Sequence, residues 1–189
     1  MRRLRKVSQK LSLPSRDASS GRSQIQLNPA KLTPSPDIYL GRLAYLMVTV
    51  AEQLDYQSET AGDQTLSKKL HLLSNKYYSK HSELIPLLSK LGVEASKLEQ
   101  LYGSSVNQLL ERTRGADFYE DMMRNYIVFG MLQDSFRRLA KGLTPARRLK
   151  VEDLLAAQEL EKLAQSTLFA AIALSLIHIS EPTRPRLSS

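Results

Sequence analysis

The feature that most constrains this chain is a long row of apolar residues at helical spacing between residues 66 and 91. Steps of three or four residues separate Leu66, Leu70, Leu73, Tyr77, His81, Leu84, Leu88 and Leu91. This spacing places them on one face of an α-helix, which cannot bury that face without other helices. Gly92 is expected to end the helix, and Pro86 is expected to kink or shorten it.

Three further segments carry rows of the same kind. One begins at Pro36, after the capping residue Ser35, and runs to about Gln57. A second begins at Asp117, which forms a capping-box-like pair with Glu120, and runs to about Lys141. The third begins at Thr144-Pro145 and runs toward Ala171. We expect one shared core that buries Leu43, Met47, Leu73, Tyr77, Met123, Ile127, Leu160 and Leu163.

The connection between the second and third of these helices is long. Residues 93–116 carry only short helical patterns, at Leu98–Leu101 and Val106–Leu110, with Gly103 and Gly115 as interruptions. Such a connection can take the chain from one end of a bundle to the other. No segment alternates with the period of a strand, so the sequence predicts an all-α four-helix bundle with a long crossover between the second and third core helices.

Composition limits the classes of function. The 189 residues include no cysteine, which excludes disulfides, zinc thiolate sites and thiol catalysis and fits a cytoplasmic protein. No apolar run reaches the length of a membrane-spanning helix, so no membrane partner is expected. The sequence leaves open whether the chain forms a homo-oligomer.

The positive charge of the chain is concentrated at the N-terminus. Eight of the 27 lysines and arginines, but only one acid, lie in the first 36 residues, whereas residues 37–173 are balanced. We expect residues 1–35 to form a disordered basic arm. Five cations near its start could bind nucleic acid such as tRNA weakly and without sequence preference: Arg2, Arg3, Arg5, Lys6 and Lys10. A solvated leader without a partner and a mitochondrial presequence are the alternatives.

The C-terminus does not resemble the rest of the chain. The stretch Leu174-Ser-Leu-Ile-His-Ile-Ser-Glu-Pro-Thr-Arg184 is similar to the translation of a sequencing-library adapter. We therefore expect the bundle to span residues 36–173, residues 174–189 to be a non-native tail, and the natural chain to continue differently after about Ala173. Because residues 174–179 are apolar, they could extend the last helix.

Three segments carry a family resemblance. They are the start of the first helix, Leu40-Gly-Arg-Leu-Ala-Tyr45, the end of the second, Leu87-Leu-Ser-Lys-Leu-Gly92, and the stretch Arg112-Thr-Arg-Gly-Ala-Asp-Phe-Tyr-Glu120 with Tyr126, Gly130, Asp134 and Phe136 after it. Over residues 38–172 the chain resembles actinobacterial ferritin-like proteins related to tRNA-(2-methylthio-isopentenyl-adenosine) hydroxylase, a di-iron oxygenase. The resemblance implies a ferritin-like bundle.

The metal ligands that the resemblance implies are mostly missing. The carboxylate position of the first helix falls on Met47, and the Glu-x-x-His of the second falls on Tyr78 and His81. The third carboxylate falls on Glu120. The last Glu-x-x-His falls near Ala156 and Glu159. The resemblance thus leaves His81, Glu120 and Glu159 as a reduced set, which suits a mononuclear iron site if the three converge.

Each of these residues also has a simpler interpretation. His81 could be a core histidine, Glu120 a helix cap and Glu159 a solvated acid, whereas Asp134 is expected to pair with an arginine or to be a buried polar group. We therefore predict a ferritin-like protein with a vestigial metal site, no cofactor, and a binding or structural role. The alternative is an iron-dependent hydroxylase that acts on tRNA or a small substrate.

Overall fold

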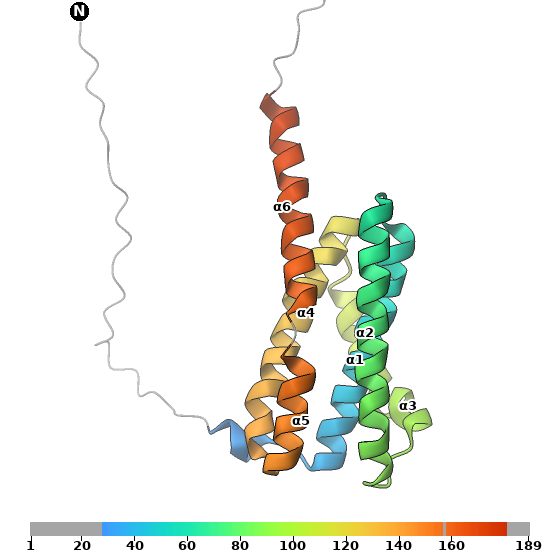
Figure 1. Ribbon diagram of the computed structural model, residues 1–189, viewed down its shortest axis with the longest axis vertical. Helices are drawn as coiled ribbons and strands as arrows, with labels where there is room; N and C mark the ends of the chain where they lie inside the picture. Colours follow the sequence, from blue (N-terminus) through green and yellow to red (C-terminus); the bar gives the residue numbers. More distant parts are fainter. Residues whose placement is uncertain (1–27, 157, 181–189) are drawn as a thin grey trace, which may run out of the picture.

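Two long antiparallel helices form one side of the bundle (Figure 1). The computed structural model describes residues 28–156 and 158–180, with side chains through residue 173. Helix α1 spans Pro36–Thr60 and α2 spans Gln64–Ser89. The Asp63 carboxylate caps α2 by accepting from the Leu66 N–H at 2.6 Å. The Ser67 hydroxyl donates to the Ser58 carbonyl at 2.7 Å and so ties the two helices together.

The end of α2 follows the sequence prediction in part. Gly92 has a φ of 76°, which residues with a side chain rarely adopt, and the Val93 N–H donates back to the Leu88 carbonyl at 3.0 Å. The helix nevertheless continues through Pro86 to Ser89. Because Pro86 lies in the last turn, only one backbone hydrogen bond is lost and little helix remains to be kinked.

The crossover contains one continuous helix where the sequence predicted two short pieces. After the short 3₁₀ helix η2, Ala95–Lys97, helix α3 spans Leu98–Arg112. Gly103 lies inside α3, where an added Cβ would be 3.1 Å from the Tyr45 hydroxyl. On α1, a Cβ at Gly41 would be 2.8 Å from the Tyr102 hydroxyl. These two glycines therefore serve close packing between α1 and α3.

The third core helix, α4, spans Phe118–Leu139 and is followed by the 3₁₀ helix η3, Ala140–Gly142. The predicted core is correct for Leu43, Met47, Leu73, Tyr77 and Leu160, which are all buried. It is wrong for α4, where Met123 and Ile127 are 39% and 47% exposed and Leu163 on the last helix is only half-buried. The face of α4 that enters the core instead carries Met122, Asn125 and Phe129.

The last core helix is broken in two, contrary to the single helix predicted. Helix α5 spans Pro145–Leu155 and α6 spans Glu159–Ser180. The buried positions of α5 are Val151, Leu154 and Leu155, and those of α6 continue at Leu160 and Ala164. The step of five from Leu155 to Leu160 does not fit one helical face, so the break lets both halves face the core. The Arg137 guanidinium donates to the Leu155 carbonyl at this break.

Part of the predicted arm packs on the bundle. The 3₁₀ helix η1, Pro29–Leu32, lies at the end of the bundle that contains η3 (Figure 1). The Thr33 hydroxyl donates to the Leu139 carbonyl at 2.5 Å, and a Cβ at Gly142 would clash with Thr33. The five predicted nucleic-acid-binding cations, Arg2, Arg3, Arg5, Lys6 and Lys10, lie outside the described residues. Of the segment likened to an adapter, residues 174–180 continue α6, and residues 181–189 are outside the description.

The described residues contain helices and no strand, as an all-α fold requires. None of their helices is long and apolar enough to cross a membrane.

Candidate metal centre

The position on α1 that the resemblance likens to a metal ligand is part of the apolar core. The Met47 side chain has no exposed surface and belongs to the main hydrophobic cluster with Leu43 and Val50. A thioether has no charge with which to neutralise an iron ion. The place where a di-iron bundle needs a carboxylate is thus filled by a packing residue.

The two ligand positions of α2 have different surroundings. His81 is partly buried, and its Nδ1 lies 2.8 Å from the Ala44 carbonyl oxygen on α1. A carbonyl can only accept, so Nδ1 carries the proton and donates it. The Tyr78 hydroxyl is a poor ligand, because partial burial raises its pKa above the ordinary value and the charges of Asp55 and Glu52 add to this effect.

Glu120 stabilises the start of α4. The Asp117 carboxylate accepts from the N–H groups of Tyr119 and Glu120 at 2.8 and 2.9 Å. Glu120 Oε2 accepts from the Ala116 N–H at 2.7 Å, while the Asp121 carboxylate accepts from the Gly115 N–H at 2.9 Å. Asp117 thus caps α4 as predicted, whereas Glu120 binds the N–H one residue before the N-cap and so has a structural task.

Glu159 lies in the first turn of α6 and forms a surface ion pair. Its Oε1 is 2.5 Å from Lys76 Nζ on α2, and both side chains are about half exposed. Asp134 pairs with Arg138 at 3.4 Å and with Arg137 at 3.9 Å, as the sequence predicted for an arginine partner.

The structure does not bring His81, Glu120 and Glu159 together. Glu120 lines a hollow with Leu168 and Ala171 of α6. Leu168 is nine residues beyond Glu159, which corresponds to about 14 Å along a helix. Within residues 28–156 and 158–180, no three histidine or carboxylate side chains are grouped closely enough to hold a metal ion.

The polar residues that are buried as a whole, among the described residues, are neutral amides and hydroxyls. Gln57, Ser74 and Asn125 are buried, and the Gln57 amide, the Ser74 hydroxyl and Asn125 Nδ2 have no hydrogen-bond partner among the described residues. Asn125 Oδ1 accepts from Arg124, which also contacts Asp121 at 3.0 Å. Two iron ions bring at least four positive charges, which neutral groups cannot balance in a low-dielectric interior. The interior therefore does not fit a di-iron centre.

Charged groups meet instead beside α1, α2 and α3. Partial loss of hydration raises the pKa of Glu52, the charge of Glu99 raises it further, and His81 opposes the rise. Glu99 and Glu52 also raise the pKa of Tyr45, after the larger effect of its own partial burial. Glu52 and Glu99 were not predicted from the sequence as members of a site. The five-residue offset of Glu52 from Met47 was the available signal that it lies on another face of α1.

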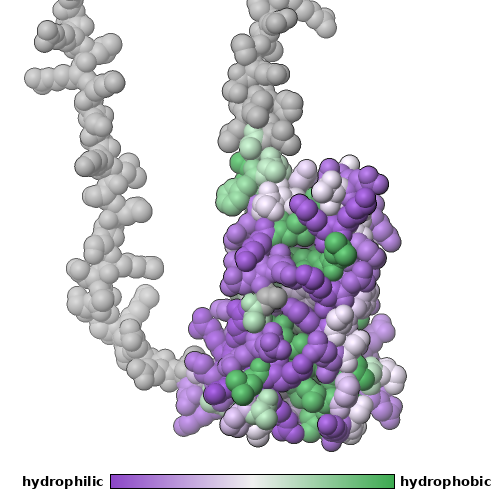
Figure 2. Space-filling view, viewed as in Figure 1, coloured by the Kyte–Doolittle hydropathy of each residue, from purple (hydrophilic) through white to green (hydrophobic). Residues whose placement is uncertain are grey.

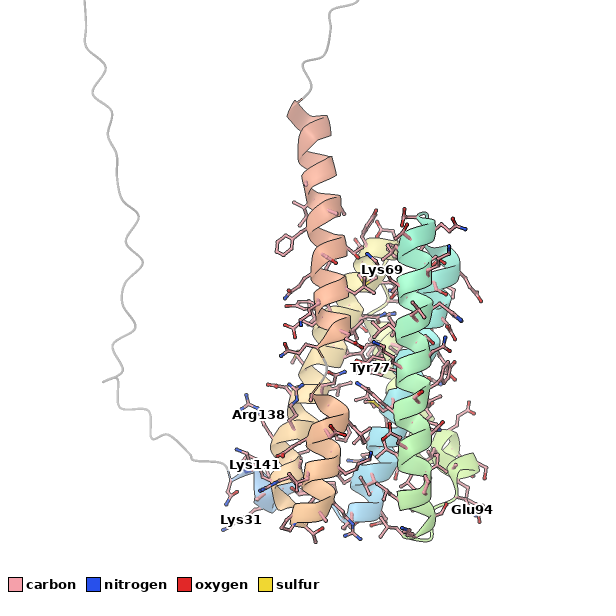
Figure 3. The ribbon with its side chains drawn as sticks, viewed as in Figure 1. Lys31, Lys69, Tyr77, Glu94, Arg138 and Lys141 are labelled. Carbon is pink, nitrogen blue, oxygen red and sulfur yellow. The ribbon has the colours of Figure 1, made fainter. Side chains whose placement is uncertain are left out.

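The Tyr77 hydroxyl spans the core between two helices. Tyr77 is buried on α2, and Gln133 of α4 donates to its hydroxyl at 2.8 Å (Figure 3). Burial raises the pKa of Tyr77, so this phenol stays neutral and serves as a hydrogen-bonded packing residue.

Comparison with known proteins identifies the fold family. The family described as "Ferritin-like domain, actinomycetes" matches residues 37–177, which is most of the chain. No curated protein matches the chain. The matched range covers all four core segments of the bundle, including the broken fourth one. The chain therefore belongs to the ferritin-like domain family of actinomycetes.

Proposed function

We propose that this ferritin-like domain has a binding or structural role and that its metal site, inherited from a relationship to tRNA hydroxylases, is vestigial. The observation that carries the proposal is the full burial of Met47 among apolar side chains at a ligand position. The capping role of Glu120 and the ion pair of Glu159 with Lys76 support it, because both acids already have partners on different parts of the bundle.

One observation favours the alternative, an iron-dependent hydroxylase. A histidine that binds metal commonly donates its other ring N–H to a carbonyl, and His81 donates to the Ala44 carbonyl in this way. Nε2 of His81 would then be the remaining ligand atom. Glu52, whose pKa responds to the charge of His81, is a carboxylate in the same region.

Oxygen consumption separates the two functions. Full-length protein supplied with ferrous iron and a reductant is compared with the His81→Ala variant, and iron alone is the blank. We expect both proteins to consume oxygen at the rate of the blank. A wild-type rate that clearly exceeds both the blank and His81→Ala would support the hydroxylase.

We further propose tRNA as a weak partner of the N-terminal segment. Arg2, Arg3, Arg5, Lys6 and Lys10 supply the positive charge. The described end of this segment, η1, packs on the bundle beside α4, and Figure 3 places Lys31 at the same end as Arg138 and Lys141. Lys31, Arg138 and Lys141 are exposed cations at the end of the bundle where the described part of the segment begins.

A further inference from the structure

The outer face of α4 is apolar. Tyr119, Met123, Ile127 and Met131 follow at four-residue spacing, and Met131 is 67% exposed. Phe169 and Ile172 on α6 are also exposed, and Figure 2 shows apolar surface at the upper end of the described α6 side chains. Together these six make up half of the large apolar side chains that the described residues expose. An apolar surface of this extent on one face indicates an interaction site.

Two hollows lie along the seam between α4 and α6. One, of about 490 Å³, is lined by Ile127, Gly130 and Met131 of α4 and by Leu160 of α6. The other, of about 470 Å³, is lined by Tyr119 and Met123 of α4 and by α6 residues that include Leu168 and Ile172. The exposed apolar side chains thus border depressions into which side chains of a partner can insert.

The charges along this face follow a self-complementary order. Glu120, Ile127, Met131 and Arg138 are separated by seven, four and seven residues, which keeps them on nearly one line along α4. The order is acidic, apolar, apolar, basic. If a second α4 runs antiparallel across this line, each Glu120 faces an Arg138 and each Ile127 faces a Met131.

We propose that the outer face of α4, with the adjoining part of α6, binds a second copy of this chain in an antiparallel, two-fold symmetric dimer. A two-fold interface must be complementary to itself, and the row from Glu120 to Arg138 meets this condition. A parallel arrangement would place Glu120 against Glu120 and Arg138 against Arg138. A face about 33 Å long and about 20 Å wide provides roughly 660 Å² per copy, close to a standard interface.

Neither charged residue uses all of its polar atoms in contacts within one chain. Glu120 uses Oε2 for the Ala116 N–H. Arg138 is 72% exposed, and its pair with Asp134 is an exposed contact of the weak i, i+4 kind. The inference is independent of iron binding, because none of these contacts involves the interior of the bundle.

The first test measures the mass of the full-length protein by sedimentation over a range of concentrations. We expect the wild type to approach twice 21.3 kDa and Ile127→Glu to shift to the monomer with unchanged helical circular dichroism. Leu72→Glu is the matched control, because Leu72 is also an exposed apolar residue, at 63% against 47% for Ile127, but lies on α2. A monomeric wild type, or a dimer lost equally in both variants, would overturn the proposal.

The second test fixes the orientation by exchange of charge. Glu120→Arg and Arg138→Glu should each weaken self-association, and a mixture of the two variants should recover a heterodimer. A mixture that fails to associate while each variant remains helical would contradict the antiparallel arrangement.

Because the chain has no cysteine, Ile127→Cys and Met131→Cys can also be mixed and cross-linked selectively. A wild type that remains monomeric while its Ile127→Cys variant is protected from alkylation would show that another part of the same chain covers this face and would overturn the dimer.

Discussion

Single residues decide what the interior of this bundle can hold. Met47 fills a ligand position with an apolar side chain, and His81 directs Nδ1 to a backbone carbonyl. Among the described residues, the buried polar side chains are neutral: Thr49, Gln57, Ser58, Ser74 and Asn125. Replacing Met47 therefore tests whether this position still tolerates a ligand.

Met47→Glu is expected to lower the free energy of unfolding by roughly 3–5 kcal/mol, because the new carboxylate is buried without a partner. Met47→Leu keeps the volume and should cost less than about 1.5 kcal/mol. Urea denaturation with and without ferrous iron measures both effects. Recovery of Met47→Glu to wild-type stability on addition of iron would indicate that a functional metal site persists.

The raised pKa of Glu52 gives a prediction about pH. The folded state binds a proton at Glu52 more tightly than the unfolded state, so stability falls as the pH rises from the ordinary pKa of glutamate through the raised pKa. Glu52→Gln should therefore raise the melting temperature at pH 7, and this gain should disappear as the pH falls below the ordinary pKa of glutamate. Glu59→Gln, on the exposed end of α1, is the control. An equal gain at both pH values would refute the assignment.

The sequence predicts which face of a helix enters the core where only one face of that helix is apolar. The row from Leu66 to Leu91 is buried or half-buried throughout, and the row of α1 from Leu40 to Leu54 is buried. Helix α4 carries apolar residues on two faces, and periodicity alone does not select Met122 over Met123. The break before α6 was detectable as a five-residue step between Leu155 and Leu160.

The candidate metal centre could also be predicted from the sequence only in part. Ligand positions follow from resemblance along the chain, whereas convergence depends on how helices are placed in space. The cap formed by Asp117 at the start of α4 is local and was predicted from its spacing of three residues from Glu120. The influence of His81 and Glu99 on the pKa of Glu52 depends on how three helices are placed in space, which the spacing of residues along the chain does not determine.

The left-handed backbone of Gly92 after the end of α2 gives a testable prediction. Gly92→Ala should destabilise the protein by about 1 kcal/mol, because alanine is strained at a φ of 76°. Gly62→Ala, between α1 and α2, is the matched control, since its φ is not positive and an added Cβ meets nothing within 4 Å. Thermal unfolding of the two variants measures the difference. Equal stability would show that the Gly92 backbone is not constrained as described.

Across the whole molecule, positive charge is separated from the balanced bundle. The first 36 residues carry eight lysines and arginines but only one acid. This segment joins the bundle through η1. Contacts between these cations and phosphates release counterions, so any affinity for tRNA must fall steeply with salt.

Neutralising the arm should weaken tRNA binding more than neutralising the bundle. A full-length variant with glutamine at Arg2, Arg3, Arg5, Lys6 and Lys10 should reduce the slope of log affinity against log salt by up to about 4. The control removes the same charge from exposed positions of the bundle: Arg42, Lys68, Lys69, Lys90 and Arg112. Filter binding at low and moderate salt measures both. Equal losses in the two variants would show that the arm contributes no more to tRNA binding than other exposed cations do.

The iron content of the full-length protein tests the proposed vestigial metal site most directly. The protein is expressed with added iron, and its iron is measured by elemental analysis against protein concentration. With Met47 in the core and Glu120 and Glu159 engaged with other partners, we predict substoichiometric iron that does not change in Glu120→Gln. A value near one iron per chain that is lost in His81→Ala would favour the hydroxylase alternative. A value close to two irons per chain would contradict the vestigial site.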